Sequence, residues 1–421
     1  MKKRICLIMA AVLTLTLAGC SADGRAADDA ALGGTVSADL ADSRGYADAV
    51  GDFAAEDSEG DIAVADSFAD EAASGAVEEI GEDVGELESV SPYAGLLTGG
   101  EWCDNEHWDY WNELYDTQEL WSEYRSDWGV SYDFRIEVAV TADGQPLEGA
   151  RVSCGEAAAV TDNSGTAYIF CSAPNGQSEP ITVTFGGESA VIDGVYGDAR
   201  VECSLDVAVP MESRSLDLMI MCDTTGSMSD ELVYLQEELA DVISRICSEN
   251  ANMTLRTSVN FYRDEGDEYV VREYPFTADA DEAVQAIREQ SADGGGDYPE
   301  AVHTALDSAL NNHDWDEDAV KIMFLVLDAP PHSDTEIVES VNSLIGQASE
   351  MGVRIIPVAS SGVDKTTEYL LRTMAFMTGG TYTFLTDDSG VGGSHIQPTV
   401  GAYNVEQLND MMVRIVNGYL D

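Results

Sequence analysis

The chain has 421 residues, which exceeds the usual size of one domain and predicts two or three compact units joined by linkers. Its 79 acidic residues against 20 basic ones give a formal net charge of −59. This excess argues against a nucleic-acid partner, because phosphate binding requires clustered Lys and Arg. Cations and cationic surfaces are the partners that such a charge favours.

The N-terminus has the three parts of a secretory signal: basic residues 2–4, an apolar stretch over 5–17, and a small-residue exit. The apolar stretch is too short to span a bilayer well. Leu17-Ala18-Gly19-Cys20 resembles the lipobox of bacterial lipoproteins. The resemblance implies that Cys20 is acylated and that the protein lies outside the cytoplasm, lipid-anchored to the bacterial cell membrane. An ordinary signal peptide with an incidental Cys is the alternative.

Residues 21–92 consist mainly of Ala, Gly, Ser, Asp and Glu, with almost no aromatic side chains. Such a segment cannot bury enough apolar surface to offset its loss of conformational entropy. We therefore expect an acidic, disordered tether that its own charge extends. Loose calcium binding by its acidic clusters is the alternative.

The composition then changes abruptly, because residues 93–132 contain five of the six Trp of the chain. Part of this segment has helical apolar spacing, which predicts an amphipathic segment docked on a neighbouring domain. A sugar-stacking surface is the alternative. The apolar stripe consists of Trp108, Trp111, Leu114, Tyr115 and Leu120.

Residues 133–210 change to a period of two, and turn sequences separate the apolar runs. This pattern predicts a small antiparallel β-sandwich. The order "DGQPLEGARV" and then "TDNSGTAYI" resembles carboxypeptidase regulatory-like and bacterial Ig-like modules, which are mostly spacers.

Three Cys, namely Cys154, Cys171 and Cys203, lie in the predicted strands of that module. Others lie before and after it, at Cys103, Cys222 and Cys247. Outside the cytoplasm a disulfide is permitted, but spacing leaves the connectivity open. No C-x-x-C spacing indicates zinc or redox chemistry.

Residues 214–421 alternate strand-like and helical patterns, which predicts an α/β doubly wound domain with a mostly parallel sheet covered on both faces. Expected strands are 216–221, 257–262, 321–327, 354–359 and 381–385. Helical apolar spacing covers 232–246, 301–310, 337–345 and 405–415. In such folds ligands bind beyond the carboxyl ends of the strands.

Oxygen-bearing side chains follow two of these strands. Asp223, Thr225 and Ser227 come after the first strand, and Asp328 ends "KIMFLVLD". Asp297 lies in the Gly-rich run "DGGGDYPEA", before a helix. Carboxylates and hydroxyls without His or thiolate suit a hard cation, with Mg²⁺ first and Ca²⁺ or Mn²⁺ as other candidates.

"DTTGS", "GGGDYPEA" and "LDAPPH" together resemble the three loops of a von Willebrand factor A domain with its metal-ion-dependent adhesion site. The resemblance covers roughly the last half of the chain. It implies that Asp223, Thr225, Ser227 and Asp328 hold the metal, and that an acidic side chain of a partner protein completes the metal shell. The usual second-loop Thr is replaced by Asp297, a departure from the family pattern.

The resemblance implies cation-dependent protein binding or adhesion at the cell surface, with no catalytic residue. Two alternatives stay open. In one, the metal only fastens the loops of a surface scaffold. In the other, the metal activates water for hydrolysis near His332, although Gly226-Ser227-Met228-Ser229 does not fit the G-x-S-x-G pattern.

Overall fold

The computed structural model describes residues 92–173, 175–209 and 214–421. The predicted signal peptide, the predicted lipidation site Cys20 and nearly all of the predicted acidic tether lie outside these residues. Among the described residues, no helix has the length and apolar character needed to cross a bilayer.

An eight-stranded sheet forms the centre of the α/β region. Its five inner strands are parallel, and antiparallel strands complete both edges. In spatial order the strands are β12 (Val271–Arg272), β11 (Thr254–Tyr262), β10 (Ser215–Asp223), β13 (Val320–Leu327), β14 (Val353–Ala359), β15 (Tyr382–Leu385), β1 (Thr98–Trp102) and β16 (Glu406–Gln407).

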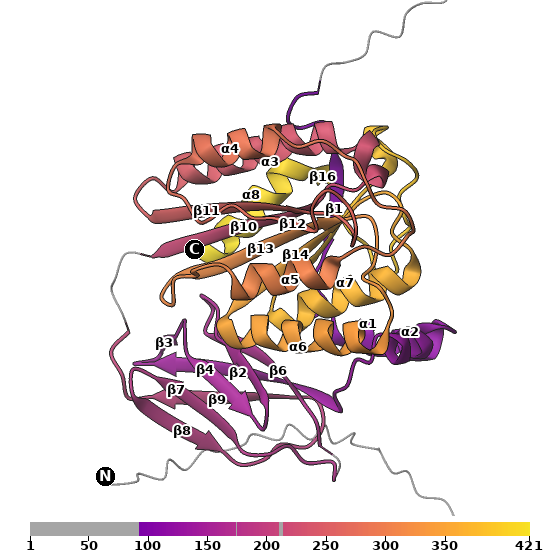
Figure 1. Ribbon diagram of the computed structural model, residues 1–421. Helices are drawn as coiled ribbons and strands as arrows, with labels where there is room; N and C mark the ends of the chain where they lie inside the picture. The colour runs from indigo at the N-terminus through magenta and orange to yellow at the C-terminus, as the bar shows by residue number, and fades with distance from the viewer. Residues whose placement is uncertain (1–91, 174, 210–213) are drawn as a thin grey trace, which may run out of the picture. The chain divides into compact units, whose positions relative to one another are not determined.

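Helices cover both faces of this sheet (Figure 1). Successive side chains of a strand point to opposite faces. Accordingly Leu218 and Ile220 of β10 join one core, whereas Met219 and Met221 join the other. The first core includes residues of α3 (Leu232–Glu249), α4 (Ala280–Arg288) and α8 (Leu408–Leu420). The second includes residues of α5 (Val302–Asn311), α6 (Thr335–Met351) and α7 (Lys365–Thr378). The region therefore has the expected α/β architecture.

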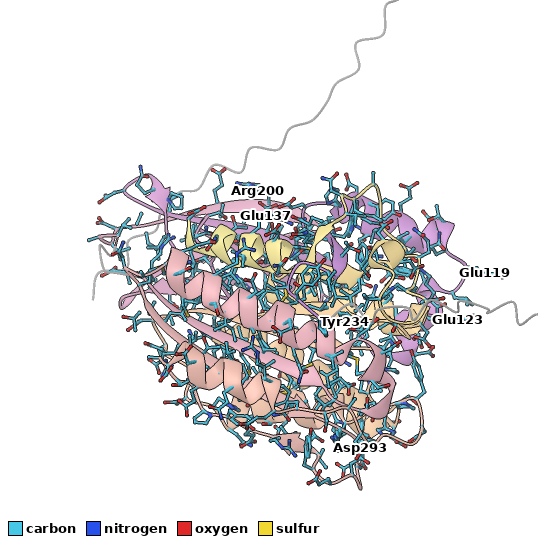
Figure 2. All side chains as sticks on the ribbon, turned by 90° about the horizontal axis from the view of Figure 1, so that it is seen from above. Glu119, Glu123, Glu137, Arg200, Tyr234 and Asp293 are labelled. Atoms are coloured by element: carbon cyan, nitrogen blue, oxygen red, sulfur yellow. The ribbon has the colours of Figure 1, made fainter. Side chains whose placement is uncertain are left out.

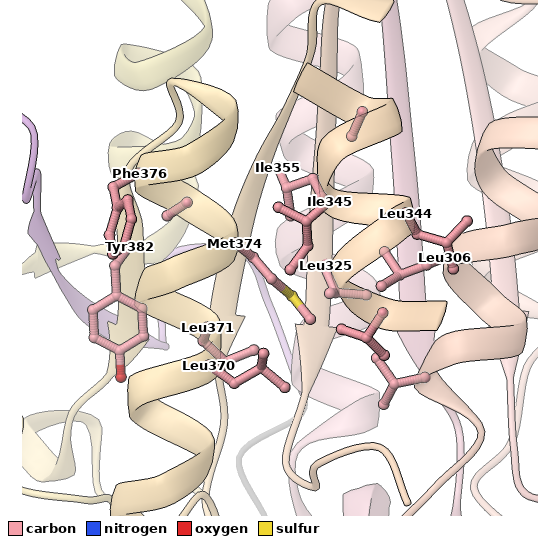
Figure 3. Packing of buried hydrophobic residues seen from close by; sticks show 14 of the residues in the cluster. Leu306, Leu325, Leu344, Ile345, Ile355, Leu370, Leu371, Met374, Phe376 and Tyr382 are labelled. Atoms are coloured by element: carbon pink, nitrogen blue, oxygen red, sulfur yellow. The ribbon is translucent and has the colours of Figure 1, made fainter. Parts of the chain in front are cut away.

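The core beneath α5, α6 and α7 is closely packed (Figure 3). Leu325 and Ile355 from the central strands belong to one fully buried cluster with Leu306, Ile345 and Met374 from the three helices. Fully burying an aliphatic side chain contributes about 1.5–3 kcal/mol. This packing fixes the strands whose carboxyl ends carry the candidate site.

Two glycines let β1 join the sheet. A Cβ at Gly99 would lie 2.8 Å from the carbonyl oxygen of Phe384, and one at Gly100 would lie 2.6 Å from its ring. Any larger residue would push β1 away from β15, so the Gly pair is a packing requirement. The segment before the two smaller sheets therefore contributes a strand to the α/β sheet, which the sequence did not predict.

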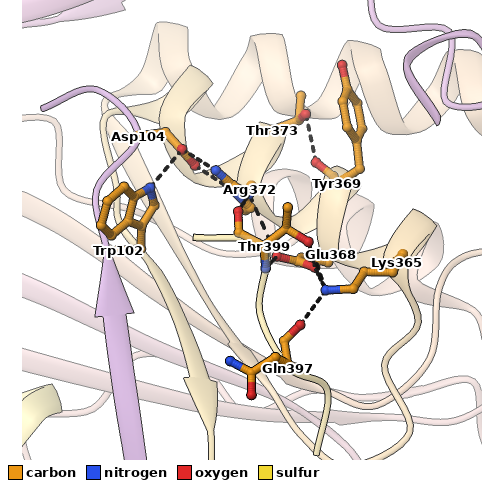
Figure 4. A network of polar contacts seen from close by, with 9 residues as sticks. All are labelled: Trp102, Asp104, Lys365, Glu368, Tyr369, Arg372, Thr373, Gln397 and Thr399. Atoms are coloured by element: carbon orange, nitrogen blue, oxygen red, sulfur yellow. Dashed lines mark hydrogen bonds and ion pairs between the residues drawn. The ribbon is translucent and has the colours of Figure 1, made fainter. Parts of the chain in front are cut away.

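A buried ionic network joins the chain after β1 to α7 (Figure 4). The guanidinium of Arg372 donates to both carboxylate oxygens of Asp104, at 2.9 and 2.6 Å, and Trp102 Nε1 donates to Asp104 at 3.1 Å. Glu368 accepts from Lys365 Nζ at 2.8 Å. Each charge has a partner of opposite sign, as burial requires.

The Trp-rich segment forms two short helices, α1 (Trp108–Thr117) and α2 (Trp121–Asp127). Trp111 and Trp121 are buried, and their rings lie 5.2 and 5.1 Å from the ring of Tyr369 on α7. These indoles are covered by protein, which contradicts the sugar-stacking alternative for them. Leu120, expected in the apolar stripe, is 44% exposed and lies between the helices, so its placement in the stripe was wrong.

Residues 134–205 form two four-stranded sheets around a common core. One sheet contains β3 (Gln145–Pro146), β2 (Phe134–Ala142), β6 (Thr166–Cys171) and β9 (Ala199–Leu205). The other contains β5 (Ala157–Val160), β4 (Arg151–Cys154), β7 (Ile181–Phe185) and β8 (Glu188–Ile192). The strand β9 pairs with β2 in parallel, so the first sheet is mixed rather than purely antiparallel. An ion pair between Arg200 and Glu137 links these two strands on the outer surface (Figure 2).

The last helix begins later than its apolar spacing suggested. It starts at Leu408, and Val405 is 43% exposed in the preceding segment. Two helices, α4 and α7, were not predicted. Most residues of α7 are buried, so it has no polar stripe that would reveal a helical period.

Candidate metal site

The predicted ligands lie where two adjacent parallel strands end. Asp223 is the last residue of β10, and Asp328 directly follows β13. The register that pairs Cys222 with Val326 brings these two strand ends side by side. The candidate site therefore lies at the carboxyl edge of the sheet, where ligands bind in open α/β folds.

The first loop holds its three predicted ligands together through hydrogen bonds. Asp223 Oδ1 accepts from the backbone N–H of Thr225 at 2.8 Å and from its hydroxyl at 2.7 Å. Thr225 Oγ1 lies 3.1 Å from Ser227 Oγ. These contacts occupy one oxygen of Asp223 and gather the three side chains in one place.

Three buried carboxyl groups of the site each keep one oxygen without a hydrogen-bond partner. These atoms are Asp223 Oδ2, Asp328 Oδ1 and Glu300 Oε2, on residues that are 0, 3 and 2% exposed. Buried polar atoms in native proteins almost always have partners, so orphaned oxygens require an explanation. A hard cation would supply a partner for such carboxylate oxygens, so the residues present fit the expected metal in this respect.

Burial and mutual repulsion oppose ionisation of these groups. Burial, followed by the charge of Asp328, raises the pKa of Asp223. Burial also raises the pKa of Asp328, although a hydrogen bond from Ser227 acts in the opposite direction. For Glu300, burial and the neighbouring carboxylates raise the pKa to about 9. A nearby cation would reverse this repulsion and favour the charged forms.

The Gly-rich second loop is fastened to the first by backbone hydrogen bonds. Gly226 N–H donates to the carbonyl of Gly294 at 3.1 Å, and the N–H of Asp293, labelled in Figure 2, donates to Thr224 O at 3.1 Å. Gly295 has φ +69°, and a Cβ there would lie 2.9 Å from Glu300 Oε1. The positive φ favours glycine at this position, and the loop passes over the Glu300 carboxyl.

Asp297 lies on the exposed rim of a cavity of about 360 Å³ that also reaches Ser227, Glu300 and Asp328. Its side chain makes no hydrogen bond with any residue that the structure describes. The helix that follows begins at Val302 with Ala301 as its N-cap residue, so Asp297 does not cap it. The other cavity-lining residues are Tyr298, Ala329, Ser361, Gly362, Gly393 and Ser394.

Glu300 is the site residue that sequence reasoning missed. The sequence favoured Asp297 because it stands nearer the glycines. Only the fold shows that Glu300, and not Asp297, is the buried carboxyl. Across the described ranges, no three Asp, Glu, His or Cys side chains are grouped closely enough to hold a metal by themselves. The hydroxyls of Thr225 and Ser227 would therefore have to supply part of the donor set.

His332, the residue of the hydrolytic alternative, contacts a different carboxylate. Its Nε2 lies 2.9 Å from Asp264 Oδ1, in the loop after β11. Asp264 is not among the three residues with orphaned oxygens. The structure therefore places His332 in a partnered contact beside the site.

The fold and the site together define an α/β binding domain with a polar site at the carboxyl edge of its sheet. Residues 217–392 match the family model of the von Willebrand factor A domain. This part of the chain is similar to von Willebrand factor A domains, and the similarity supports a general role in protein interaction or adhesion.

A second similarity concerns a viral protein. The chain is 33% identical over 138 residues to an ariadne-like RING finger protein of Acanthamoeba polyphaga mimivirus. The match covers 31% of this chain and 13% of that protein. Because the shared part is a small fraction of the viral protein, the similarity assigns no activity to this chain.

Proposed function

We propose that the von Willebrand factor A domain binds one divalent cation, Mg²⁺ first, and through it a partner protein at the cell surface. The observation that carries this proposal is the set of orphaned, buried carboxyl oxygens on Asp223, Asp328 and Glu300. Unpaired buried charge is costly, and a hard cation offsets that cost.

The donor set would combine side chains of the three loops. Asp223, Thr225 and Ser227 come from the first loop, Glu300 or Asp297 from the second, and Asp328 from the third. Water would complete the shell, because Mg²⁺ usually keeps several water molecules. The bound ion would supply a positive centre that accepts an oxygen ligand from outside.

The open side of the site supports binding of a partner. The cavity of about 360 Å³ gives an incoming carboxylate access to Ser227 and Asp328. Tyr298, 43% exposed, stands at its rim and donates from its hydroxyl to Gly362 O at 3.0 Å. A rigid, partly exposed aromatic side chain beside a charged centre is typical of residues that contribute to protein interfaces.

The proposal also places the protein outside the cytoplasm, anchored in the bacterial membrane through an acylated Cys20. Acyl chains on one terminus hold a protein firmly when more than one is present. In this arrangement the acidic tether would carry the binding domain away from the membrane. The proposal includes no catalytic step.

The test is capture of a surface partner by immobilised wild-type protein and by Asp223→Asn, with Mg²⁺ and with chelator. We expect a partner that wild type retains only with Mg²⁺ and that the variant does not retain. If wild type keeps the partner in chelator, the cation has only a structural role or none. Loss of the Cys20→Ala variant from the membrane fraction would separately support the lipid anchor.

A further inference from the structure

We propose that Cys154 and Cys171 form a disulfide that links the two smaller sheets once the protein has left the cytoplasm. Cys154 is the last residue of β4, and Cys171 is the last residue of β6 in the facing sheet. The bond would therefore connect two separate sheets. This inference rests on the export part of the proposed function and is independent of the metal site.

The geometry brings the two sulfur atoms together. The thiol of Cys171 donates to Cys154 Sγ at a distance of 3.1 Å, and the two residues are 1 and 5% exposed. A disulfide has an S–S distance of about 2.05 Å, so closure requires a movement of about 1 Å. The proposal assigns this movement to rotation of the two Cys side chains within the existing strand register.

The surroundings distinguish this pair from other Cys of the chain. Cys222 lies in β10, where its thiol contacts the backbone oxygen of Asp223, and Cys247 lies on α3. Neither thiol forms a hydrogen bond with a second sulfur among the described residues. Cys203 belongs to the same core as Cys154 and Cys171, so an experiment must separate it from the proposed pair.

The reaction balances by thiol–disulfide exchange with an exported protein or small molecule that carries a reactive disulfide. One Cys thiolate attacks that disulfide, forms a mixed disulfide and releases one thiolate of the oxidant. The second Cys thiolate then attacks the mixed disulfide and releases the other. Two thiols of the chain lose two protons and two electrons, and the oxidant is reduced to its dithiol form.

We expect Cys154 and Cys171 to be oxidised while the chain folds, before the core of the two smaller sheets has formed. Burial, together with the neighbouring Cys154, raises the pKa of Cys171, which disfavours the thiolate that exchange requires. Reduced, folded protein should therefore oxidise slowly, whereas reduced, unfolded protein should form the bond as it refolds with oxidised glutathione.

The test maps disulfides in full-length protein exported to an oxidising compartment. Thiols are alkylated in denaturant, and the unreduced chain is cleaved after Glu. Cleavage then leaves Cys154, Cys171 and Cys203 on separate peptides, because it follows Glu148, Glu156, Glu188 and Glu202. We expect linked peptides that contain Cys154 and Cys171. Recovery of both peptides as alkylated thiols, or linkage of either to Cys203, would overturn the proposal.

A stability measurement complements the map. Reductant should lower the apparent melting temperature of exported wild type by several degrees, because the bond restricts the unfolded chain. The Cys154→Ser, Cys171→Ser double variant should show no such shift, while the matched Cys247→Ser control should behave as wild type. An equal reductant effect in the double variant would contradict the assignment. Metal binding should not differ between the oxidised and reduced forms, so failure here is distinguishable from failure of the cation proposal.

Discussion

Two buried aspartates at opposite ends of β10 have contrasting surroundings. Asp217 is 1% exposed and receives two hydrogen bonds from Arg256, at 2.8 and 2.6 Å. Asp223 is fully buried, lacks any cationic partner among the described residues and keeps Oδ2 unpaired. The same residue type on one strand thus forms an ion pair at one end, whereas at the other end one buried carboxyl oxygen has no partner among the described residues.

Removing the Arg256 guanidinium that pairs with Asp217 should have the largest effect on stability. Arg256→Met would leave the buried Asp217 carboxylate without its ion-pair partner and with the backbone N–H of Asp316, at 2.7 Å, as its remaining hydrogen-bond donor. We expect the free energy of unfolding to fall by about 3 kcal/mol. Urea denaturation with and without Mg²⁺ measures this loss, which should be equal in both conditions. Arg414→Met is the matched control, because its ion pairs are surface-exposed and contribute less than about 1 kcal/mol. A loss that Mg²⁺ cancels would contradict the contrast between the two ends.

The unpaired end should respond in the opposite way. Asp223→Asn keeps an oxygen for Thr225 but removes a repelling charge, so stability in chelator should stay equal or rise. Wild type should gain about 2.7 kcal/mol at a Mg²⁺ concentration of one hundred times Kd, and the variant should lose most of this gain. Thermal melts across a Mg²⁺ titration measure both the stability in chelator and the gain of stability with Mg²⁺. An equal gain in the variant would show that the ion binds elsewhere.

The second loop offers a comparison of a buried and an exposed carboxyl. We expect Glu300→Gln to weaken Mg²⁺ binding about tenfold, which is about 1.4 kcal/mol. Asp297→Asn should weaken it less, because Asp297 is exposed and water screens its charge. Isothermal titration calorimetry of the two variants with Mg²⁺ compares their affinities for the ion. If Asp297→Asn has the larger effect, the exposed carboxyl is the ligand, as the sequence position had suggested.

The smallest expected effect concerns the loop that forms one wall of the cavity. His395 lies between Glu231 and Asp387, with both ring nitrogens 2.9 Å from a carboxylate oxygen. Burial is the largest single influence on the pKa of His395 and acts to lower it, but the two hydrogen bonds and the charges of Glu231 and Asp387 together outweigh burial, so the pKa is raised. Its stabilising contribution is therefore complete below about pH 6.5, the ordinary value, and is lost as pH rises through the higher folded value.

The matched variant His395→Gln isolates that contribution. We expect wild type to exceed the variant by on the order of 1 kcal/mol at pH 5.5, with a difference that shrinks as pH increases. Denaturant melts at a series of pH values measure the difference. A gap that widens with increasing pH would mean that the imidazole is not held as a cation between Glu231 and Asp387.

The sequence predicted the parts of the fold that have a clear period. The strands ending at Asp223 and before Asp328, and the helices with one apolar face, follow directly from local pattern. The helix α7 was not predicted because Tyr369, Arg372 and most of its other residues are buried, so its sequence shows no apolar face opposite a polar one. Pairing of β1 with β15 depends on contacts between distant segments, which no local pattern contains.

The candidate site was only partly predictable for the same reason. The sequence spacing was enough to select Asp223, Thr225 and Ser227 as candidates. They stand at the end of a predicted strand and at the two alternate positions that follow it. The burial of Glu300 depends on how the glycine loop folds over it, which composition does not reveal. Asp297 was chosen from its position in the motif, whereas the structure leaves it exposed.

The central claim is that one divalent cation binds among Asp223, Asp328 and their hydroxyl neighbours. Titration of full-length mature protein with Mn²⁺, followed by the loss of the free-ion electron paramagnetic resonance signal, tests it most directly. The acidic segment 21–92 is the same in wild type and in Asp223→Asn, so any ion that it binds contributes equally to both curves. We predict that wild type binds one more tightly held ion per chain than the variant and that Mg²⁺ displaces it. Identical binding curves for the two proteins would contradict the account.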